Sequence, residues 1–348
     1  MTEKDRNDLN HMTTDGAGAG EPVVELRHGA GGEESGRLVA EVFAEAFHSD
    51  VLDRMEDAAV LPPLDGMPVM TSDTFVVDPL FFPGGDIGRL AVCGTVNDIA
   101  CMGATPLYIT TAFVLETGLP IATLRKVVRS LAETAREAGV KIVAGDTKVV
   151  EGNGGLHINT TGLGQRPADC RISASAMKPG DSLIVTGNLG DHHATILTCR
   201  LGMESALRSD CAPLNSMVSE LLESGVEVHT IRDITRGGLA TMVNELSGAS
   251  RCGVEVWQEN LPVSDGVRGL SGILGLDPLT MGNEGKLLIA VPGSEAERAL
   301  EIVRRHPMGH DAAIVGSVTE GTGAVLVTTL GSRRKLLPLR GEGLPRIC

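Results

Sequence analysis

The chain has 348 residues, of which 42% are hydrophobic but only 2% aromatic, and its 45 acidic and 30 basic side chains give a net charge of −15. This length is too great for one ordinary small core and fits two domains of about 150 residues each. The acidic balance argues against a nucleic-acid partner, because binding of DNA or RNA depends on lysines and arginines that neutralise phosphates.

Cysteine usage and the amino-terminal segment indicate the compartment. The seven cysteines form no C-x-x-C pair, so neither a zinc-ribbon spacing nor a compact disulfide framework is present. Scattered cysteines in a chain of this size are typical of a reduced, cytoplasmic protein. No apolar run approaches the roughly 18 residues that a membrane helix needs, and the first ten residues do not resemble a signal peptide. We therefore expect a cytoplasmic protein without a membrane partner.

Residues 1–22 are polar and rich in glycine, and we expect them to form a disordered extension. A first domain is expected over residues 23–165. Its hydrophobic periodicity predicts, in chain order, a helix over 35–48, a strand over 69–77, a helix over 86–102, a strand over 108–115, a helix over 121–138, and strands over 141–150 and 156–164.

The regular pattern stops at residues 164–181, where we place the domain boundary, and resumes in a second domain over residues 176–335. The pattern there predicts strands over 182–187, 286–291, 312–318 and 324–330, helices over 191–202 and 295–306, and a helix entered through 232–238. Ser294 and Glu297 match a capping box for the last helix. Strands and helices mingle in both halves, which predicts α/β (α+β) domains. From residue 336 to residue 348, prolines and glycines predict a flexible tail that ends in Cys348.

Four carboxylates interrupt segments that otherwise belong in a core. Asp73 and Asp146 lie in predicted strands, and Asp98 lies in an apolar helix. Glu284 lies in the short sequence GNEGK, with a glycine on either side of the Asn–Glu pair. A buried charge costs several kcal/mol unless it is paired or bound to a metal. Any one of the four could be the partner of an arginine or a helix cap. Together they favour Mg²⁺, which bridges carboxylates to phosphate oxygens, and Lys148 could contact a phosphate from the same strand face as Asp146.

Familiar nucleotide motifs are missing, because the chain has neither a Walker loop nor a strict G-x-G-x-x-G. The glycine-rich residues 28–32 are a weak signal and could be a flexible lead into the first helix. His192 and His193 have no metal-ligand partner at a suitable spacing, so we expect surface or capping roles for both.

Six segments together resemble the HypE family of hydrogenase maturation proteins: residues 71–88, 94–104, 145–150, 232–238, 283–286 and the terminal PRIC at 345–348. The resemblance runs from about residue 24 to the end of the chain. The wider superfamily, which includes aminoimidazole ribonucleotide synthetase, binds ATP without a Walker loop and uses Mg²⁺ held by acidic residues. A PurM/AIR synthetase-like fold is therefore implied, with an amino-terminal sheet domain that pairs with its copy in a homodimer.

The resemblance also implies an activity, which is the ATP-dependent dehydration of a carboxamide on the sulfur of Cys348 to a thiocyanate. That group would supply cyanide ligands for nickel–iron hydrogenase. The implied partners are the carbamoyltransferase HypF, which loads the carboxamide, and the HypC–HypD complex, which carries the iron. The implied site residues are Asp73, Asp98 and Asp146 for Mg²⁺ and ATP, Asn97 for the nucleotide, Lys148 for a phosphate, and Glu284 beside the reactive group.

Two departures from the family pattern stand out, namely the extension at residues 1–22 and His193, which replaces a glycine that could have supplied a positive φ. Two alternatives stay open. Another ATP-dependent superfamily member, of the selenophosphate synthetase or thiamine-monophosphate kinase type, would share the fold. A selenophosphate synthetase would need a reactive cysteine in an early glycine-rich loop, and no cysteine precedes Cys93. The second alternative is a non-catalytic carrier that only presents Cys348 to a partner.

Overall fold

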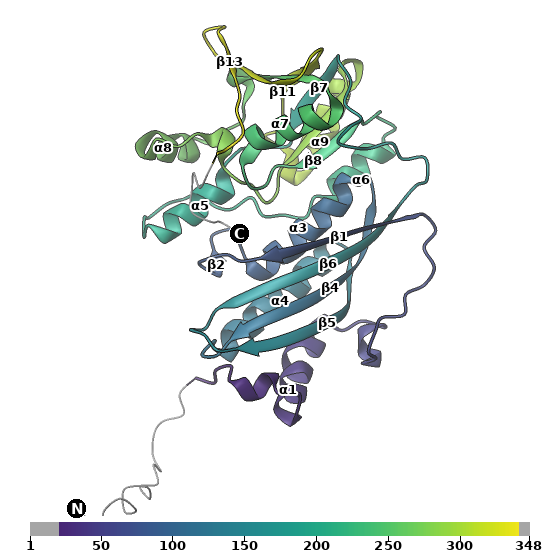
Figure 1. Cartoon of the computed structure of the whole chain (residues 1–348), viewed down its shortest axis with the longest axis vertical. Helices are drawn as coiled ribbons and strands as arrows, with labels where there is room; N and C mark the ends of the chain where they lie inside the picture. The colour runs from purple at the N-terminus through teal and green to yellow at the C-terminus, as the bar shows by residue number, and fades with distance from the viewer. Residues whose placement is uncertain (1–20, 341–348) are drawn as a thin grey trace, which may run out of the picture.

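A computed structural model of the chain describes residues 21–340, so the expected extension up to residue 20 and Cys348 lie outside the described residues. Two layered α/β units follow one another along the long axis of the molecule (Figure 1). None of the helices within residues 21–340 is long and apolar enough to cross a membrane.

The first unit is built on a four-stranded sheet with the order β1-β6-β4-β5. Its strands are β1 (Met67–Phe75), β4 (Thr105–Glu116), β5 (Lys141–Val150) and β6 (Leu156–Arg166). β4 and β5 are parallel, while β6 pairs antiparallel with β1 and β4. The short strands β2 (Phe81–Phe82) and β3 (Gly85–Asp86) form a separate pair. Helices α3 (Ile87–Cys101) and α4 (Ile121–Glu137) cover one face of the sheet (Figure 1).

Helix α3 begins at Asp86, whose carboxylate accepts hydrogen bonds from the backbone N–H groups of Gly88 and Arg89. Thirteen of its fifteen residues are buried, and only Arg89 and Asp98 keep appreciable exposure. A helix that is apolar all round must be covered on every side. α3 therefore lies inside the molecule, with the sheet and α4 on one side and the second unit on the other.

A helical segment at the start of the chain packs beside β5. It consists of α1 (Glu33–Leu38), a π-helical turn over Val39–Ala44, and α2 (Glu45–Phe47), so a helix is present where residues 35–48 predict one. Phe43 and Phe47 from this segment meet Phe113 of β4, with ring centroids 4.9 and 6.4 Å from that of Phe113. These rings account for half of the six phenylalanines in the chain.

The second unit is built on a seven-stranded sheet with the order β13-β12-β9-β11-β7-β10-β8. Its strands are β7 (Asp181–Val185), β8 (Thr230–Asp233), β9 (Gly253–Trp257), β10 (Leu287–Pro292), β11 (Ala313–Thr319), β12 (Gly323–Val327) and β13 (Arg333–Lys335). Its helices are α5 (Asp191–Arg200), α6 (Asn215–Glu223), α7 (Gly238–Ser250), α8 (Asp265–Leu274) and α9 (Ala296–Arg305). The α/β fold class expected from the sequence is confirmed.

Sequence periodicity missed several elements of this unit, among them α8. Three glycines interrupt α8, and each disfavours a helix by about 1 kcal/mol relative to alanine. The helix forms because Ser264 caps its start and because Val267 and Leu270 pack with residues of α5. The predicted capping box at Ser294 is wrong. Ser294 lies in a short 3-10 turn, and Glu295, the residue before α9, makes no side-chain cap.

Residues 336–340, the first part of the expected tail, run along α7. Leu336 is buried, and its N–H donates to the carbonyl of Ala324. The Asn244 amide donates to the Leu336 carbonyl at 2.9 Å, and the Leu339 N–H donates to the Thr241 hydroxyl at 3.1 Å. Because contacts move from Asn244 to Thr241 as the chain advances, the chain is directed toward the amino-terminal end of α7.

Candidate active site between the two units

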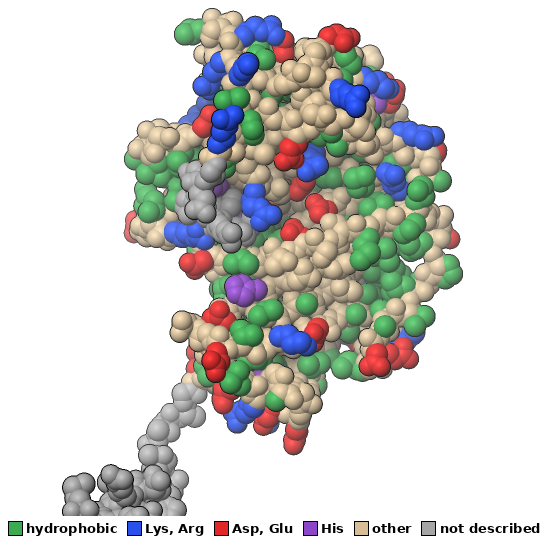
Figure 2. Space-filling view, viewed as in Figure 1, with side chains coloured by type: hydrophobic (Ala, Val, Ile, Leu, Met, Phe, Trp, Pro, Cys, Tyr) green, Lys and Arg blue, Asp and Glu red, His purple; other side chains and the backbone are tan. Residues whose placement is uncertain are grey.

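A cleft of about 430 Å³ lies between the two units. β1 and α3 line it from the first unit, and the segment around β8 together with Glu284 lines it from the second. On the face shown in Figure 2, acidic and basic side chains gather where the two units meet. The cleft brings together Asp73, Asp98 and Glu284, which lie up to 211 positions apart in the sequence.

Asp98 projects into the cleft from α3 and is held by one hydroxyl. The Thr71 Oγ1 donates to Asp98 Oδ2 at 2.8 Å. Burial raises the pKa of Asp98, and the nearby Asp73 raises it further, whereas Thr71 and Arg232 oppose the shift. The two carboxylates therefore repel each other across the cleft.

Asp233 is a fourth cleft carboxylate, for which no role was predicted although it lies within residues 232–238, one of the segments that carry the family resemblance. Burial raises the pKa of Asp233 to about 6, and the charges of Asp98 and Asp73 add to that shift. Arg232 offsets it only partly, since its guanidinium is 4.0 Å from Asp233 and also pairs with Glu245 at 3.3 Å. The cleft thus holds excess negative charge that a divalent cation would neutralise.

The described residues contain no group of three or more His, Cys, Asp or Glu side chains arranged to enclose a metal ion. Mg²⁺ does not require such a group, because it commonly takes one or two carboxylates, several waters and the phosphates of a nucleotide. The carboxylates of Asp73 and Asp98 fit such a partly open site.

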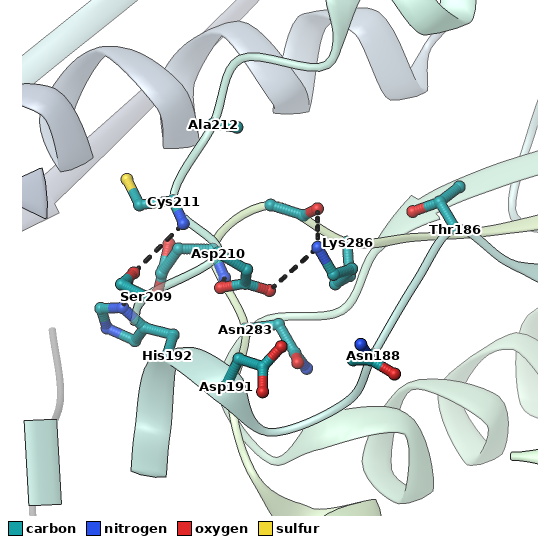
Figure 3. A network of polar contacts seen from close by, with 12 residues as sticks. Thr186, Asn188, Asp191, His192, Ser209, Asp210, Cys211, Ala212, Asn283 and Lys286 are labelled. Carbon is teal, nitrogen blue, oxygen red and sulfur yellow. Dashed lines mark hydrogen bonds and ion pairs between the residues drawn. The ribbon is translucent and has the colours of Figure 1, made fainter. Parts of the chain in front are cut away.

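Glu284 is 5% exposed and enters the cleft from the loop that precedes β10. Its backbone N–H donates to Asp210 Oδ1 at 3.0 Å. The neighbouring Asn283 accepts from the Gly190 N–H at 2.7 Å and donates to the Ile234 carbonyl at 2.9 Å. Figure 3 shows Asn283 and Asp210 within one polar network.

Asn97, predicted to bind the nucleotide, is 3% exposed and does not line the described cleft. Its amide donates to the Ala212 carbonyl at 3.1 Å, and its Oδ1 accepts from the Leu214 N–H at 2.8 Å. The Asn97 side chain therefore links α3 to the loop of the second unit that contains Ala212 and Leu214.

Asp146 and Lys148 lie elsewhere on the single chain, in a pocket of about 390 Å³ beside β5. Phe43, Phe47 and Phe113 supply apolar walls there, and the glycine-rich residues near His28 are at its rim. Lys148 Nζ is 2.7 Å from Asp146 Oδ2, and this bond lowers the pKa of Asp146. Within one chain, Asp146 and Lys148 therefore lie in a different pocket from the cleft carboxylates.

Of the surface or capping roles expected for His192 and His193, the surface role is wrong, since both side chains are buried. His193 lies inside α5, and the positive φ of this turn, 88°, belongs to Gly190. The residue that replaces the family glycine is therefore not in the left-handed region. Burial lowers the pKa of His193 to about 4, so its ring is neutral at pH 7.

Comparison with known proteins decides the family. The models of the AIR synthase related protein amino-terminal and carboxy-terminal domains match residues 55–165 and 178–328. The chain is 46% identical over 333 residues to a carbamoyl dehydratase HypE of Azotobacter vinelandii, covering 93% of this chain and 97% of that protein. The chain belongs to the HypE family of carbamoyl dehydratases.

Solved structures agree with this assignment. A structure of the hydrogenase maturation protein HypE in complex with ATP matches with a TM-score of 0.89 and 44% identity, covering 93% of this chain and 99% of that one. A structure of a HypE–HypF complex matches with a TM-score of 0.77 and 43% identity, covering 87% and 99%. A thiamine-monophosphate kinase from Stenotrophomonas maltophilia, at 21% identity and a TM-score of 0.68, shares the fold. The PurM-like fold expected from the sequence is confirmed.

Proposed function

We propose that this protein uses ATP to dehydrate a carboxamide on the sulfur of Cys348 to a thiocyanate. The observation that carries the proposal is the cleft in which Asp73, Asp98 and Glu284 converge, in a chain of the HypE family. The HypE structure with ATP supports ATP as the phosphoryl donor. Mg²⁺ held by Asp73 and Asp98 would neutralise charge on the nucleotide phosphates.

The reaction balances in two steps. In the first, the amide oxygen attacks the γ-phosphorus, an O–P bond forms, the bond to ADP breaks, and a base takes one N–H proton. In the second, a base takes the other N–H proton, the C–O bond breaks, and phosphate leaves with the original amide oxygen, so that S–C≡N remains. We assign Glu284 as the base and Lys148 as a contact to a phosphate oxygen.

The described part of the tail supports delivery of Cys348 to the cleft. The chain is attached to α7 up to Leu339, and Thr235 and Arg236, just before α7, line the cleft. The eight residues 341–348 can span at most about 28 Å at roughly 3.5 Å per residue. Three residues of helix separate Thr241 from Gly238, a rise of only about 4.5 Å. The cleft rim therefore lies within reach of the terminal thiol.

A homodimer would bring Asp146 and Lys148 to the cleft of the other copy. β1 and β5 are the two edges of the first sheet, and neither edge is completed by another strand within residues 21–340. The face opposite α3 and α4 is also bare in Figure 1. We infer that β5 of one copy joins β1 of the other, because open edges and an uncovered sheet face favour pairing with a second chain. Asp98 and Asp146 of different copies would then serve one site.

A carbamoyltransferase of the HypF type would load the carboxamide, as the HypE–HypF complex supports. A scaffold of the HypC–HypD type would receive the product nitrile. Mass spectrometry of the intact protein with carbamoyl phosphate, ATP and the transferase tests the reaction. Loading should add about 43 Da and ATP should then remove about 18 Da, simple mass arithmetic for one carbamoyl group and one water. Cys348→Ala should show neither step. Loading without the later loss would favour the carrier alternative instead.

Mixed dimers test the shared site. Asp98→Asn and Asp146→Asn should each abolish ATP turnover as separate proteins. After denaturation and refolding of an equal mixture, about half of the dimers contain one intact site of two, so about a quarter of wild-type turnover should return. No recovery from a mixture that demonstrably forms mixed dimers would contradict the shared site.

A further inference from the structure

The segment that carries Glu284 lies against a second loop, residues 209–212, at very close range. A Cβ added to Gly285 would be 1.9 Å from the backbone oxygen of Asp210, so no side chain fits at that position. The Glu284 N–H donates to Asp210 Oδ1 at 3.0 Å across the same contact. These contacts tie the Glu284 backbone to the 209–212 loop, and Asn97 Nδ2 also lies 3.5 Å from the Glu284 carbonyl oxygen.

Asp210 is in turn held by a buried charge. Lys286 Nζ lies 3.7 Å from Asp210 Oδ2 and donates to the Gly285 carbonyl at 3.1 Å, and the two side chains are only 7% and 3% exposed (Figure 3). Among residues 21–340, Asp210 Oδ2 has no partner within hydrogen-bond distance, and Lys286 is the cation that faces it. Such a pair is weak evidence for stability, because an apolar pair of similar volume often serves the fold as well.

The other end of this loop is attached to the first unit. Asn97 binds the Ala212 carbonyl and the Leu214 N–H, and Arg89, nearer the start of the same helix, donates through Nε to the Cys211 carbonyl at 2.9 Å. Asn97 precedes Asp98 directly on α3. A continuous chain of contacts thus runs from the helix that carries Asp98 to the backbone of Glu284.

We propose that Asp210, held by Lys286, is a positioning residue that sets the place of Glu284 relative to Asp98 and so to the reacting amide. This inference rests on the role proposed above for Glu284. Positioning depends on the acceptor oxygen of Asp210, which receives the Glu284 N–H, while Lys286 compensates the buried charge of the Asp210 carboxylate. A base displaced by about 1 Å can lose on the order of a hundredfold in rate.

Two double variants separate positioning from stability. Asp210→Asn with Lys286→Met removes both charges and keeps an acceptor oxygen for the Glu284 N–H. Asp210→Ala with Lys286→Met also removes both charges but leaves no acceptor. Thr186→Val is the matched control, because the Thr186 hydroxyl accepts from the Leu287 N–H at 2.9 Å in the same buried segment, three residues after Glu284. All are first loaded with the carboxamide by the transferase.

The measurements are the single-turnover rate of thiocyanate formation against ATP concentration, and hydrogen exchange of the peptide that contains the Glu284 amide. The double variant with Asp210→Ala should react tenfold to a hundredfold more slowly at saturating ATP, while the ATP concentration that gives half the maximal rate should change less than threefold. The Glu284 amide of this variant should exchange faster. The Asp210→Asn pair and Thr186→Val should keep rates within threefold of wild type and should keep that amide protected.

Equal rates in the two folded double variants, whether both near wild type or both low, would overturn the proposal. If the wild type itself formed no thiocyanate, the proposed function would be wrong. Hydrogen exchange would still test whether Asp210 holds the Glu284 backbone. An unchanged Glu284 amide in the Asp210→Ala pair would then refute it.

Discussion

Replacing Asp233 by asparagine should stabilise the protein at neutral pH while it abolishes or severely slows the reaction. The pKa of Asp233 is about 6, raised from 3.8 by burial and by the charges of Asp98 and Asp73. At 1.36 kcal/mol for each tenfold change in proton affinity, keeping this group ionised in the folded protein costs about 3 kcal/mol. The side chain remains 16% exposed, so this magnitude is an upper estimate.

The sign follows from the raised pKa of an acid. Below about pH 3.8 the carboxyl is protonated in both the folded and the unfolded states, so asparagine brings no advantage there. The cost of ionisation grows as pH rises from about 3.8 to about 6 and is fully present above that. The stability gain of Asp233→Asn should therefore appear over this range and stay constant from pH 7 to pH 8.

Urea unfolding at several pH values measures the gain, with Asp169→Asn on the exposed surface as the control, which should show no such dependence. Mg²⁺ with ATP should reduce the difference in unfolding free energy between the variant and the wild type, because a bound cation stabilises the ionised carboxylate of the wild type. If Asp233→Asn were no more stable than the wild type at pH 8, the electrostatic argument would be refuted. Such an exchange of stability for function is common at active sites.

Three further outcomes follow from the packing. Gly285→Ala should cost about 1–3 kcal/mol in urea unfolding, because its Cβ would overlap the Asp210 backbone, whereas Gly272→Ala in α8, with open space around it, should be neutral or stabilising. Asn244→Ala should slow thiocyanate formation a few-fold at unchanged half-saturating ATP, because the tail loses an attachment to α7; an unchanged rate would exclude that guiding role. Deletion of residues 1–20 should leave folding and ATP turnover intact, as circular dichroism and phosphate release would show, and loss of either would contradict the predicted dispensability.

Much of this protein could be inferred from local sequence. The apolar residues located α3, α4 and β5, since α3 is a long apolar run, α4 has apolar residues at helical spacing, and β5 has apolar residues near both ends. Asp73, Asp98 and Glu284 were recognisable as candidates because each interrupts an apolar or glycine-flanked segment, and the structure brings all three to one cleft. The motifs also identified the family, which the identity of the relatives confirms.

Other features depend on contacts between distant segments. Asn97 carries the same polar signal as Asp98, yet the structure turns it toward Ala212 and Leu214. His192 and His193 are polar in sequence but buried in the structure, because α5 packs against β2 of the first unit and α8 of the second.

Asp233 and Lys286 lie in recognised segments, but local sequence shows neither the raised pKa of Asp233 nor the Asp210–Lys286 pair. Both arise only when remote segments exclude water together. Residue type and spacing therefore determined which groups could perform the chemistry. Tertiary packing decided which of them meet, because side-chain direction and desolvation are properties of neighbours that the chain supplies from far away.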